Sequence, residues 1–231
     1  MLKTEFAVKM TCSQCSEKVR GSLKGLNIES CHLDVPSQTV VLESKEPPSR
    51  LLTAIRSSGL ITALRGIASP FTAKATPYTY PAAAVCIFES FKGAAQGWAQ
   101  DVNRGLARLV QIGENEIFVD LSVDNLEPNS AYSFRVNECG DLSQGAESTG
   151  DCFRRIGQIF TDSLGKGEFM GEVKGLSIWQ IVGRSLVLEP MFGPRSDSIA
   201  GIVARSGGLF ENKKTVCACS GKTLWEEASR L

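Results

Sequence analysis

Two pairs of cysteines near the ends of the chain have spacings that suit soft-metal or thiol chemistry. Cys12 and Cys15 lie near the start with two residues between them, and Cys217 and Cys219 lie near the end with one residue between them. Thiolates select Cu(I) and other soft metals over hard ions, and neighbouring thiols can also exchange disulfides. The long middle of the chain has no histidine, since the only one is His32. The sequence therefore places the reactive groups at its two ends.

The first cysteine pair has the features of an open Cu(I) site. Two thiolates at this spacing can share one exposed loop, and two ligands leave the ion free to pass to a partner by ligand exchange. Cys15 falls at a predicted helix start, where the helix dipole lowers the pKa of a thiol. Half of a zinc site and a redox or structural thiol pair are the alternatives, although only Cys31 and His32 are near enough in sequence to complete a zinc site. We interpret His32 as an ordinary strand residue, and Cys31 and Cys86 as core thiols.

The second cysteine pair supports two kinds of chemistry. Side chains one residue apart on an extended segment point to the same side. Cys217 and Cys219 could therefore bind one Cu(I) together, or one could attack a disulfide that the other resolves. Lys213, Lys214 and Lys222 nearby favour the thiolate form. A disulfide within the tail, or one end of an intermolecular zinc clamp, is the alternative, and a cluster joining both pairs is also compatible.

Composition and charge restrict the class of protein. The 231 residues suffice for one or two domains, and 42% hydrophobic with 22% charged residues indicates a globular chain. The 25 acidic and 25 basic residues balance, so no global field favours nucleic acid or an anionic membrane. No apolar run approaches the roughly 18 residues of a membrane span, and the N-terminus carries charges where a signal peptide would be apolar. We therefore expect a cytoplasmic protein whose cysteines serve as metal or redox groups.

Four segments follow one another along the chain. Residues 1–65 show the order strand, helix, strand, strand, helix, strand, which is that of a ferredoxin-like domain. Residues 66–81 are rich in Pro, Ala and Thr and are expected to be a linker. Residues 82–205 carry short strand patterns typical of a Greek-key barrel or sandwich. Residues 206–231 are predicted to be a short flexible tail. The fold class is thus α+β with several domains.

Individual elements can be predicted within these segments. The apolar positions of the first segment indicate the following elements: strands around Phe6–Val8, at Ile28–Val35, Thr39–Glu43 and Ile61–Leu64, and helices from Cys15 to Gly25 and from Pro48 to Gly59. The strands expected in the third segment include Ile117–Val123, Tyr132–Val136, Ile181–Leu188 and Ile199–Ala204. The glycine-rich stretch Gly140–Gly175 shows little pattern and is expected to be mostly loop.

Three groups of residues resemble known families. Residues 10–15 (MTCSQC) resemble heavy-metal-associated domains, residues 105–107, 134–141 (FRVNECGD) and 183–187 (GRSLV) resemble Cu/Zn superoxide dismutase, and residues 202–206 with 217–227 form the most specific match. In this order the three groups resemble the copper chaperones for superoxide dismutase, the fungal members more than the animal ones.

This resemblance implies roles for the two cysteine pairs. Cys12 and Cys15 would bind Cu(I), with Met10 as a buried neighbour supporting their loop. Cys217 and Cys219 would insert copper into the target enzyme and exchange disulfides with it. The family also implies the cytoplasm as location, with the mitochondrial intermembrane space as a second one.

For the middle domain the resemblance implies a docking face. It would form a heterodimer with immature Cu/Zn superoxide dismutase and a homodimer when that target is absent, because a two-fold dimer uses one self-complementary surface. The docking residues implied are Cys139, Gly140, Asp141, Val182, Gly183, Arg184, Ile202, Ala204 and Arg205. The alternative is that these residues only hold the sandwich together, with Gly140 and Gly183 as turn glycines.

The middle domain departs from an active dismutase at its metal sites. By resemblance, the copper-ligand positions hold Arg135, Asn137 and, by looser alignment, Glu189, the bridging-histidine position falls near Cys152, and the positions of the internal disulfide fall near Ala146 and Ala200. Since dismutation needs a redox metal held by imidazoles, we expect neither copper nor zinc in this domain.

Together these features indicate a metallochaperone rather than an enzyme. The first domain would collect Cu(I), the second would dock on the immature dismutase, and the tail would insert the ion and promote the target's disulfide, with oxygen as the electron acceptor by resemblance. A dismutase, a general thiol oxidoreductase and a passive Cu(I) store are the alternatives. The missing histidines argue against the first of these.

Overall fold

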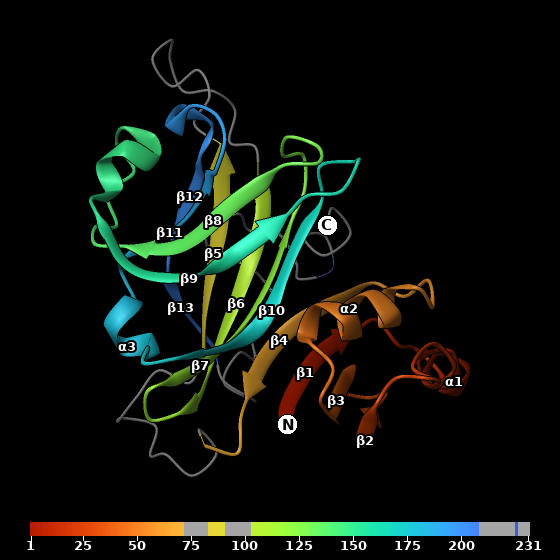
Figure 1. Cartoon of the computed structure of the whole chain (residues 1–231). Coiled ribbons are helices and arrows are strands. Elements are labelled where there is room, and N and C mark those ends of the chain that lie inside the picture. Colours follow the sequence, from red (N-terminus) through yellow and green to blue (C-terminus); the bar gives the residue numbers. More distant parts are fainter. Residues whose placement is uncertain (72–82, 91–102, 208–224, 226–231) are drawn as a thin grey trace. The chain divides into compact units, whose positions relative to one another are not determined.

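The computed structural model describes residues 1–71, 83–90, 103–207 and 225, which belong to two compact units (Figure 1). Of the described residues, 1–71, 207 and 225 belong to the first unit, and 83–90 and 103–206 belong to the second. Most of the expected linker and of the C-terminal tail, including Cys217 and Cys219, lies outside the described residues.

The first unit has the predicted order of strands and helices. Its elements are β1 (Leu2–Val8), α1 (Ser13–Ser22), β2 (Ile28–Asp34), β3 (Thr39–Ser44), α2 (Pro48–Arg56) and β4 (Thr62–Ala68). The sheet order is β2-β3-β1-β4, so the ferredoxin-like prediction is confirmed. Strand β4 continues to Ala68, three residues beyond the boundary expected at residue 65.

The core of the first unit follows from its two sequence periods. Alternate residues of the central strands, such as Phe6 and Val8 of β1, are fully buried beneath the two helices. Helix α2 contributes Leu51 and Ile55, which are four positions apart and lie on the same side of the helix. Each fully buried side chain of this size stabilises the fold by about 1.5–3 kcal/mol. The two helices thus cover one face of the sheet.

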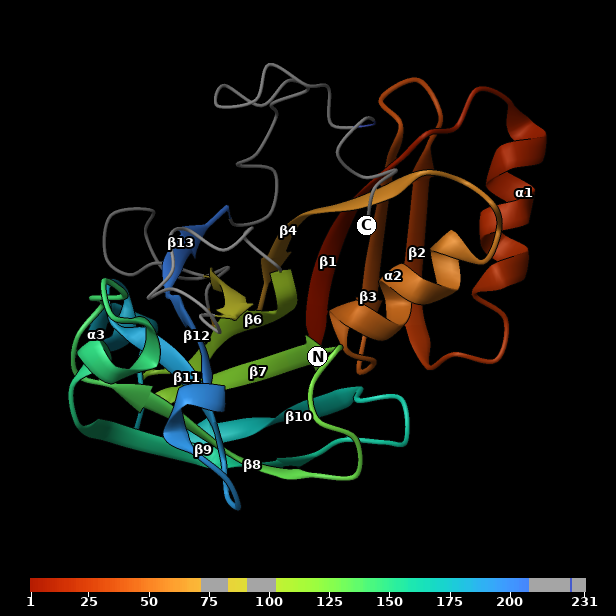
Figure 2. The same ribbon diagram turned by 90° about the horizontal axis from the view of Figure 1, so that it is seen from above.

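The second unit is the predicted antiparallel Greek-key barrel or sandwich. Its elements are β5 (Ala83–Ser90), β6 (Asn103–Gly113), β7 (Glu116–Val123), β8 (Ala131–Asn137), the 3₁₀ helix η3 (Gly145–Thr149), β9 (Cys152–Phe160), β10 (Gly167–Lys174), α3 (Ile178–Ile181), β11 (Ser185–Pro190), η4 (Arg195–Asp197), β12 (Ile199–Ile202) and β13 (Ala204–Ser206). The strand order is β10-β7-β6-β5-β12-β11-β8-β9, and β13 pairs with β5. Strands β7 and β8 follow one another in the sequence but do not pair. Strand β8 pairs with β11, whereas β7 lies between β6 and β10 (Figure 2).

Two expectations for the second unit were wrong. The stretch Gly140–Gly175 contains β9 and β10 and is not mostly loop. A side chain on Gly157 would lie 2.7 Å from the ring of Phe169, so this glycine makes room for close packing within a strand. The strand expected at Ile181–Leu188 begins only at Ser185, because Ile181 ends α3 and Gly183 turns the chain at φ +84°.

Candidate metal and docking sites

The loop between β1 and α1 brings the two N-terminal cysteines together. Cys12 has an extended backbone and caps the N-terminus of α1, so Cys15 lies in the first helical turn. The two sulfur atoms are 3.6 Å apart, close enough for one metal ion to contact both. Cys12 is exposed and Cys15 is half-buried. The pair therefore forms a two-thiol site that is open to a partner.

Hydrogen bonds favour the thiolate form of Cys15. The backbone of Thr11 contributes most, followed by the Cys12 thiol and the Thr11 hydroxyl, and together they lower the pKa of Cys15 to about 7 from its usual 9.0. The Thr11 Oγ1 lies 3.8 Å from the Cys15 sulfur. Thr11 was not among the predicted site residues, although a hydroxyl residue directly before the first cysteine could have indicated this contact.

Met10 anchors the loop between β1 and α1. Its side chain is buried in the core of the first unit, as expected. Its carbonyl accepts a hydrogen bond from Gln38 Nε2 at 3.1 Å, and the Gln38 carbonyl accepts one from the Val8 amide at 2.9 Å. The turn between β2 and β3 thus holds the residues that precede the cysteines.

Three residues that were interpreted as structural lie in a strand or against a core. His32 lies on β2 and is exposed. Cys31, on the same strand, packs partly against the core of the first unit, and Cys86 is fully buried in the core of the second. Across the described residues, no group of three or more His, Cys, Asp or Glu side chains is placed to hold a metal ion.

In the second unit, the implied docking residues come together from three places in the sequence. They lie after β8, in the turn between α3 and β11, and on β12 and β13. The Gly183 amide donates to the Val203 carbonyl at 2.9 Å. A side chain on Gly140 would lie 2.1 Å from the Gly183 carbonyl oxygen, so only glycine permits this approach. Ile202 is 44% exposed beside them.

Arg184 joins these segments. Its guanidinium donates to the Glu138 carbonyl at 2.6 Å and to the Gln180 carbonyl at 2.8 Å, and it lies 4.1 Å from the centre of the Phe153 ring. The Ser185 hydroxyl donates to the Cys139 carbonyl at 2.7 Å. Sequence reasoning missed Phe153, which is partly exposed, because strand β9 was not predicted.

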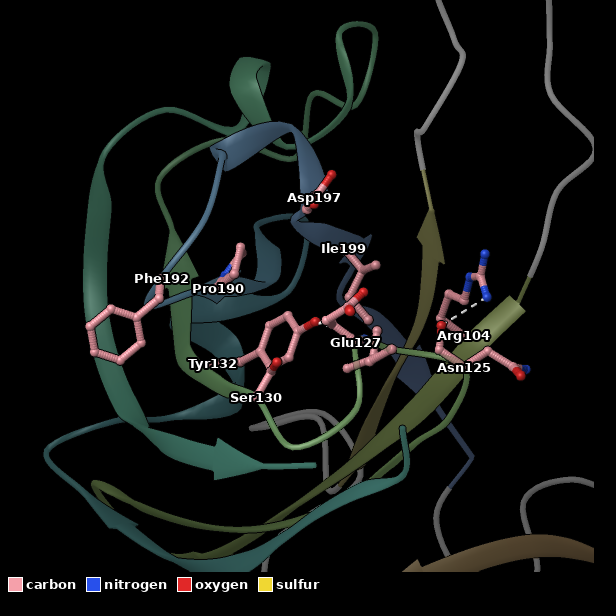
Figure 3. A pocket seen from close by; sticks show the side chains of 10 residues that line it. Arg104, Asn125, Glu127, Ser130, Tyr132, Pro190, Phe192, Asp197 and Ile199 are labelled. Carbon is pink, nitrogen blue, oxygen red and sulfur yellow. Dashed lines mark hydrogen bonds between the residues drawn. The ribbon is translucent and has the colours of Figure 1, made fainter. Parts of the chain in front are cut away.

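A separate pocket lies in the second unit (Figure 3). Its lining includes Arg104, Tyr132, Phe192 and Ile199. The Tyr132 hydroxyl accepts a hydrogen bond from the Glu127 amide at 3.1 Å, and Arg104 donates to the Asn125 carbonyl at 3.0 Å. These contacts hold the chain that follows β7. No thiol or imidazole lines the pocket, so we assign it no part in copper binding.

Comparison with known proteins decides the family. Residues 5–59 match the heavy-metal-associated domain family. The superoxide dismutase 1 copper chaperone of Debaryomyces hansenii is 37% identical over 97% of this chain and 93% of its own length, and that of Saccharomyces cerevisiae is 34% identical over 96% and 92%. The copper chaperone for superoxide dismutase of Homo sapiens is 27% identical over 98% and 89%. The chain belongs to the superoxide dismutase copper chaperones. Its higher identity to the yeast proteins agrees with the fungal resemblance.

In this chaperone the residues that the resemblance aligns with dismutase copper ligands form an internal polar contact. Arg135 on β8 makes an ion pair with Glu189 on β11, and Arg135 Nε donates to Asn137 Oδ1 at 3.0 Å. A guanidinium is always protonated and has no free lone pair with which to bind a metal ion. Arg135 therefore cannot serve as a ligand for copper or zinc. Ala146 and Ala200 lie in one small apolar cluster with Val187.

The lowered pKa of Cys15 predicts a reactive thiol in the metal-free, reduced chaperone. Because alkylation requires the thiolate, its rate at Cys15 should rise with pH and be half-maximal at about pH 7. Cys31 serves as the internal control, since burial raises the pKa of its thiol and should delay its reaction to higher pH. The measurement is iodoacetamide labelling across a pH series, read by peptide mass spectrometry. A midpoint for Cys15 near its usual 9.0 would contradict the prediction.

Proposed function

We propose that this chain collects Cu(I) on Cys12 and Cys15 and delivers it to Cu/Zn superoxide dismutase. The observation that supports this most is the pair of sulfur atoms, 3.6 Å apart at the exposed start of α1. Soft thiolates suit Cu(I). A site with two ligands leaves room for a third from the receiving protein, so the ion can move by exchange without being released into water.

The second unit is proposed to dock on the immature dismutase as a heterodimer, and on a second copy of this chain when the target is absent. The convergence of Gly140, Gly183 and Ile202 on one surface supports this. A two-fold dimer uses the same patch on both subunits, so one face can serve both assemblies. We also propose that this unit carries neither copper nor zinc, since Arg135 and Glu189 neutralise each other where a metal would lie.

Cys217 and Cys219 are proposed to insert the ion into the target and to promote its disulfide. Forming a disulfide from two thiols releases two protons and two electrons, and molecular oxygen is the proposed acceptor, giving hydrogen peroxide. The two thiols suit both steps, because they can share one Cu(I) or pass a disulfide to the target.

The proposed location is the cytoplasm, with the mitochondrial intermembrane space as a second site. Reduced thiols persist in the cytosol, which this chemistry requires. Within the described part of the chain, no helix is long and apolar enough to cross a membrane.

The test is activation of the target. The Cu(I)-loaded chain is mixed with metal-free, zinc-restored and disulfide-reduced Cu/Zn superoxide dismutase in air, with a Cu(I) chelator present, and dismutase activity is followed. We expect activity in the mixture and none from the chain alone. A Cys217→Ser, Cys219→Ser variant should keep Cu(I) at Cys12 and Cys15 yet give almost no activation. No activation by the unsubstituted chain would favour passive storage, and full activation by the variant would exclude the tail's role.

A thiol oxidoreductase is the second candidate, because Cys15 is a partly exposed thiol of lowered pKa. It predicts turnover with unrelated reduced proteins under air in the absence of copper. Disulfide formation confined to the dismutase would exclude it.

A further inference from the structure

A continuous series of polar contacts crosses the second unit toward the docking face. It begins with the ion pair between Glu189 on β11 and Arg135 on β8. Arg135 Nε donates to the side-chain oxygen of Asn137 at 3.0 Å. The Asn137 amide then donates to Thr149 Oγ1 at 2.8 Å and to the Gly150 carbonyl at 3.1 Å. The series thus leads from the sheet into the segment that follows β8.

Thr149 carries the series to a docking residue. Its side chain is buried, and its hydroxyl donates to the Ala146 carbonyl at 2.6 Å. Its carbonyl accepts the backbone N–H of Cys139 at 2.8 Å. Since the Cys139 carbonyl accepts a bond from Ser185, both polar backbone groups of this residue are held. The position of Cys139 therefore depends on Thr149 and on what fixes Thr149.

Asn137 is the central member of this series. It is 0% exposed, and its side-chain oxygen and its amide group both have partners. Burying an amide is costly unless its hydrogen bonds are made. An apolar residue of similar size could fill the space but could not hold Thr149 and Gly150. The buried amide thus has a task that packing alone does not perform.

Apart from the hydrogen bonds from Arg184 and Ser185 at its start, the segment that Asn137 holds is anchored by few apolar contacts. Residues 138–151 contain no strand, and their only regular element is η3. Their apolar contact with the sheet consists mainly of Ala146 and Leu142 against Val187 and Ala200, which is a small area. Such a segment opens locally at low cost unless specific bonds fix it. Polar contacts must therefore supply much of its order.

We propose that Asn137 is a positioning residue that fixes the segment 138–151 and thereby presents Cys139, Gly140 and Asp141 for docking. It acts through Thr149 and does not touch the partner. This inference rests on the proposed docking function. It goes beyond the proposed docking function because it names an interior residue, away from the contact surface, on which the affinity for the partner depends.

The test compares Asn137→Leu with Ser133→Ala in the full chain. Ser133 is a matched control, because it lies on the same face of β8 and its hydroxyl has no hydrogen-bond partner among the described residues. Two quantities are measured: amide hydrogen exchange of the chain alone, and its association with metal-free, disulfide-reduced Cu/Zn superoxide dismutase by sedimentation. For Asn137→Leu we expect exchange in residues 138–151 to be roughly tenfold faster and association roughly tenfold weaker. In Asn137→Leu, amide exchange in strands β5–β7 should be unchanged. Ser133→Ala should change neither exchange nor association.

A second variant covers the case in which Asn137→Leu does not fold. Thr149→Val keeps the shape of the side chain but removes the hydroxyl that Asn137 contacts. It should therefore also speed exchange in residues 138–151 and weaken association. Thr149→Ser keeps the hydroxyl and should behave as wild type. Unchanged exchange, or faster exchange with unchanged association, would overturn the inference. If the docking function itself is wrong, the unsubstituted chain and Ser133→Ala will not associate with the dismutase either. That result would also remove the docking role of Asn137.

Discussion

A chain carrying Cys12→Ser and Cys15→Ser is expected to lose Cu(I) affinity at the first domain by roughly a hundredfold or more, since changes beyond the metal ligands already cost about 10–100-fold. The two sulfurs that lie 3.6 Å apart would be replaced by hydroxyls. Hydroxyl oxygens are hard donors that do not suit Cu(I). The fold should persist, because Cys12 is exposed and Cys15 only half-buried.

The measurement is competition for Cu(I) against a chromophoric chelator. Both the variant and its reference carry Cys217→Ser and Cys219→Ser, so that only one candidate pair remains. Cys31→Ser is the matched control, because Cys31 is a thiol of the same domain that lies on β2 and packs partly against the core. It should keep the affinity. Equal loss in the control would assign the effect to the fold, and retained affinity in the double variant would contradict the site.

Gly183→Glu is expected to abolish association with the dismutase. Gly183 is an exposed residue of the proposed docking face, and a side chain there meets no atom within 4 Å. The free chain therefore has room for the substitution, although φ of +84° adds strain. In the complex, the carboxylate would be buried without a partner, which costs about 3–5 kcal/mol. That corresponds to a loss of affinity of more than about a hundredfold.

Gly193→Glu provides the matched control for this experiment. Gly193 is exposed, has a positive φ of +130°, and likewise has no atom within 4 Å of the added carbon. It lies between β11 and η4, outside the proposed face. Sedimentation of each variant with the dismutase should show complex formation only for Gly193→Glu. Both variants should unfold at similar temperatures, and an intact complex with Gly183→Glu would refute the docking face.

The elements of the first domain were predictable because their signals are local. The apolar positions of α2 repeat at three and four residues, and Pro48 occupies its first turn, where proline is tolerated. Gly25 and Gly59 follow the helices with φ of +86° and +80°, the conformation in which glycine commonly ends a helix. Each of these features depends on the chain's immediate neighbours.

Strands β9 and β10 were not predictable from such signals. Most residues of β9 are exposed, so the strand lacks the alternation that marks a half-buried one. Gly157 and Gly171 are typical of loops in sequence, yet they lie beside the ring of Phe169. Phe169 is on the same strand as Gly171, but for Gly157 it is a neighbour on a different strand, which the residues adjacent to Gly157 do not reveal.

The amino-acid sequence by itself predicted the proposed metal site of this protein. Cys12 caps α1 and Cys15 lies in its first turn, and the spacing along the chain sets how far apart two thiols can be. Tertiary structure decided which distant residues lie together in the second unit. The proposed docking face unites residues after β8 with others near β11 and β12, and the role proposed for Asn137 depends on its contacts with Thr149 and Arg135. The physical reason is the range of the interactions: short loops constrain neighbours directly, whereas contacts between distant strands exist only once the barrel has closed.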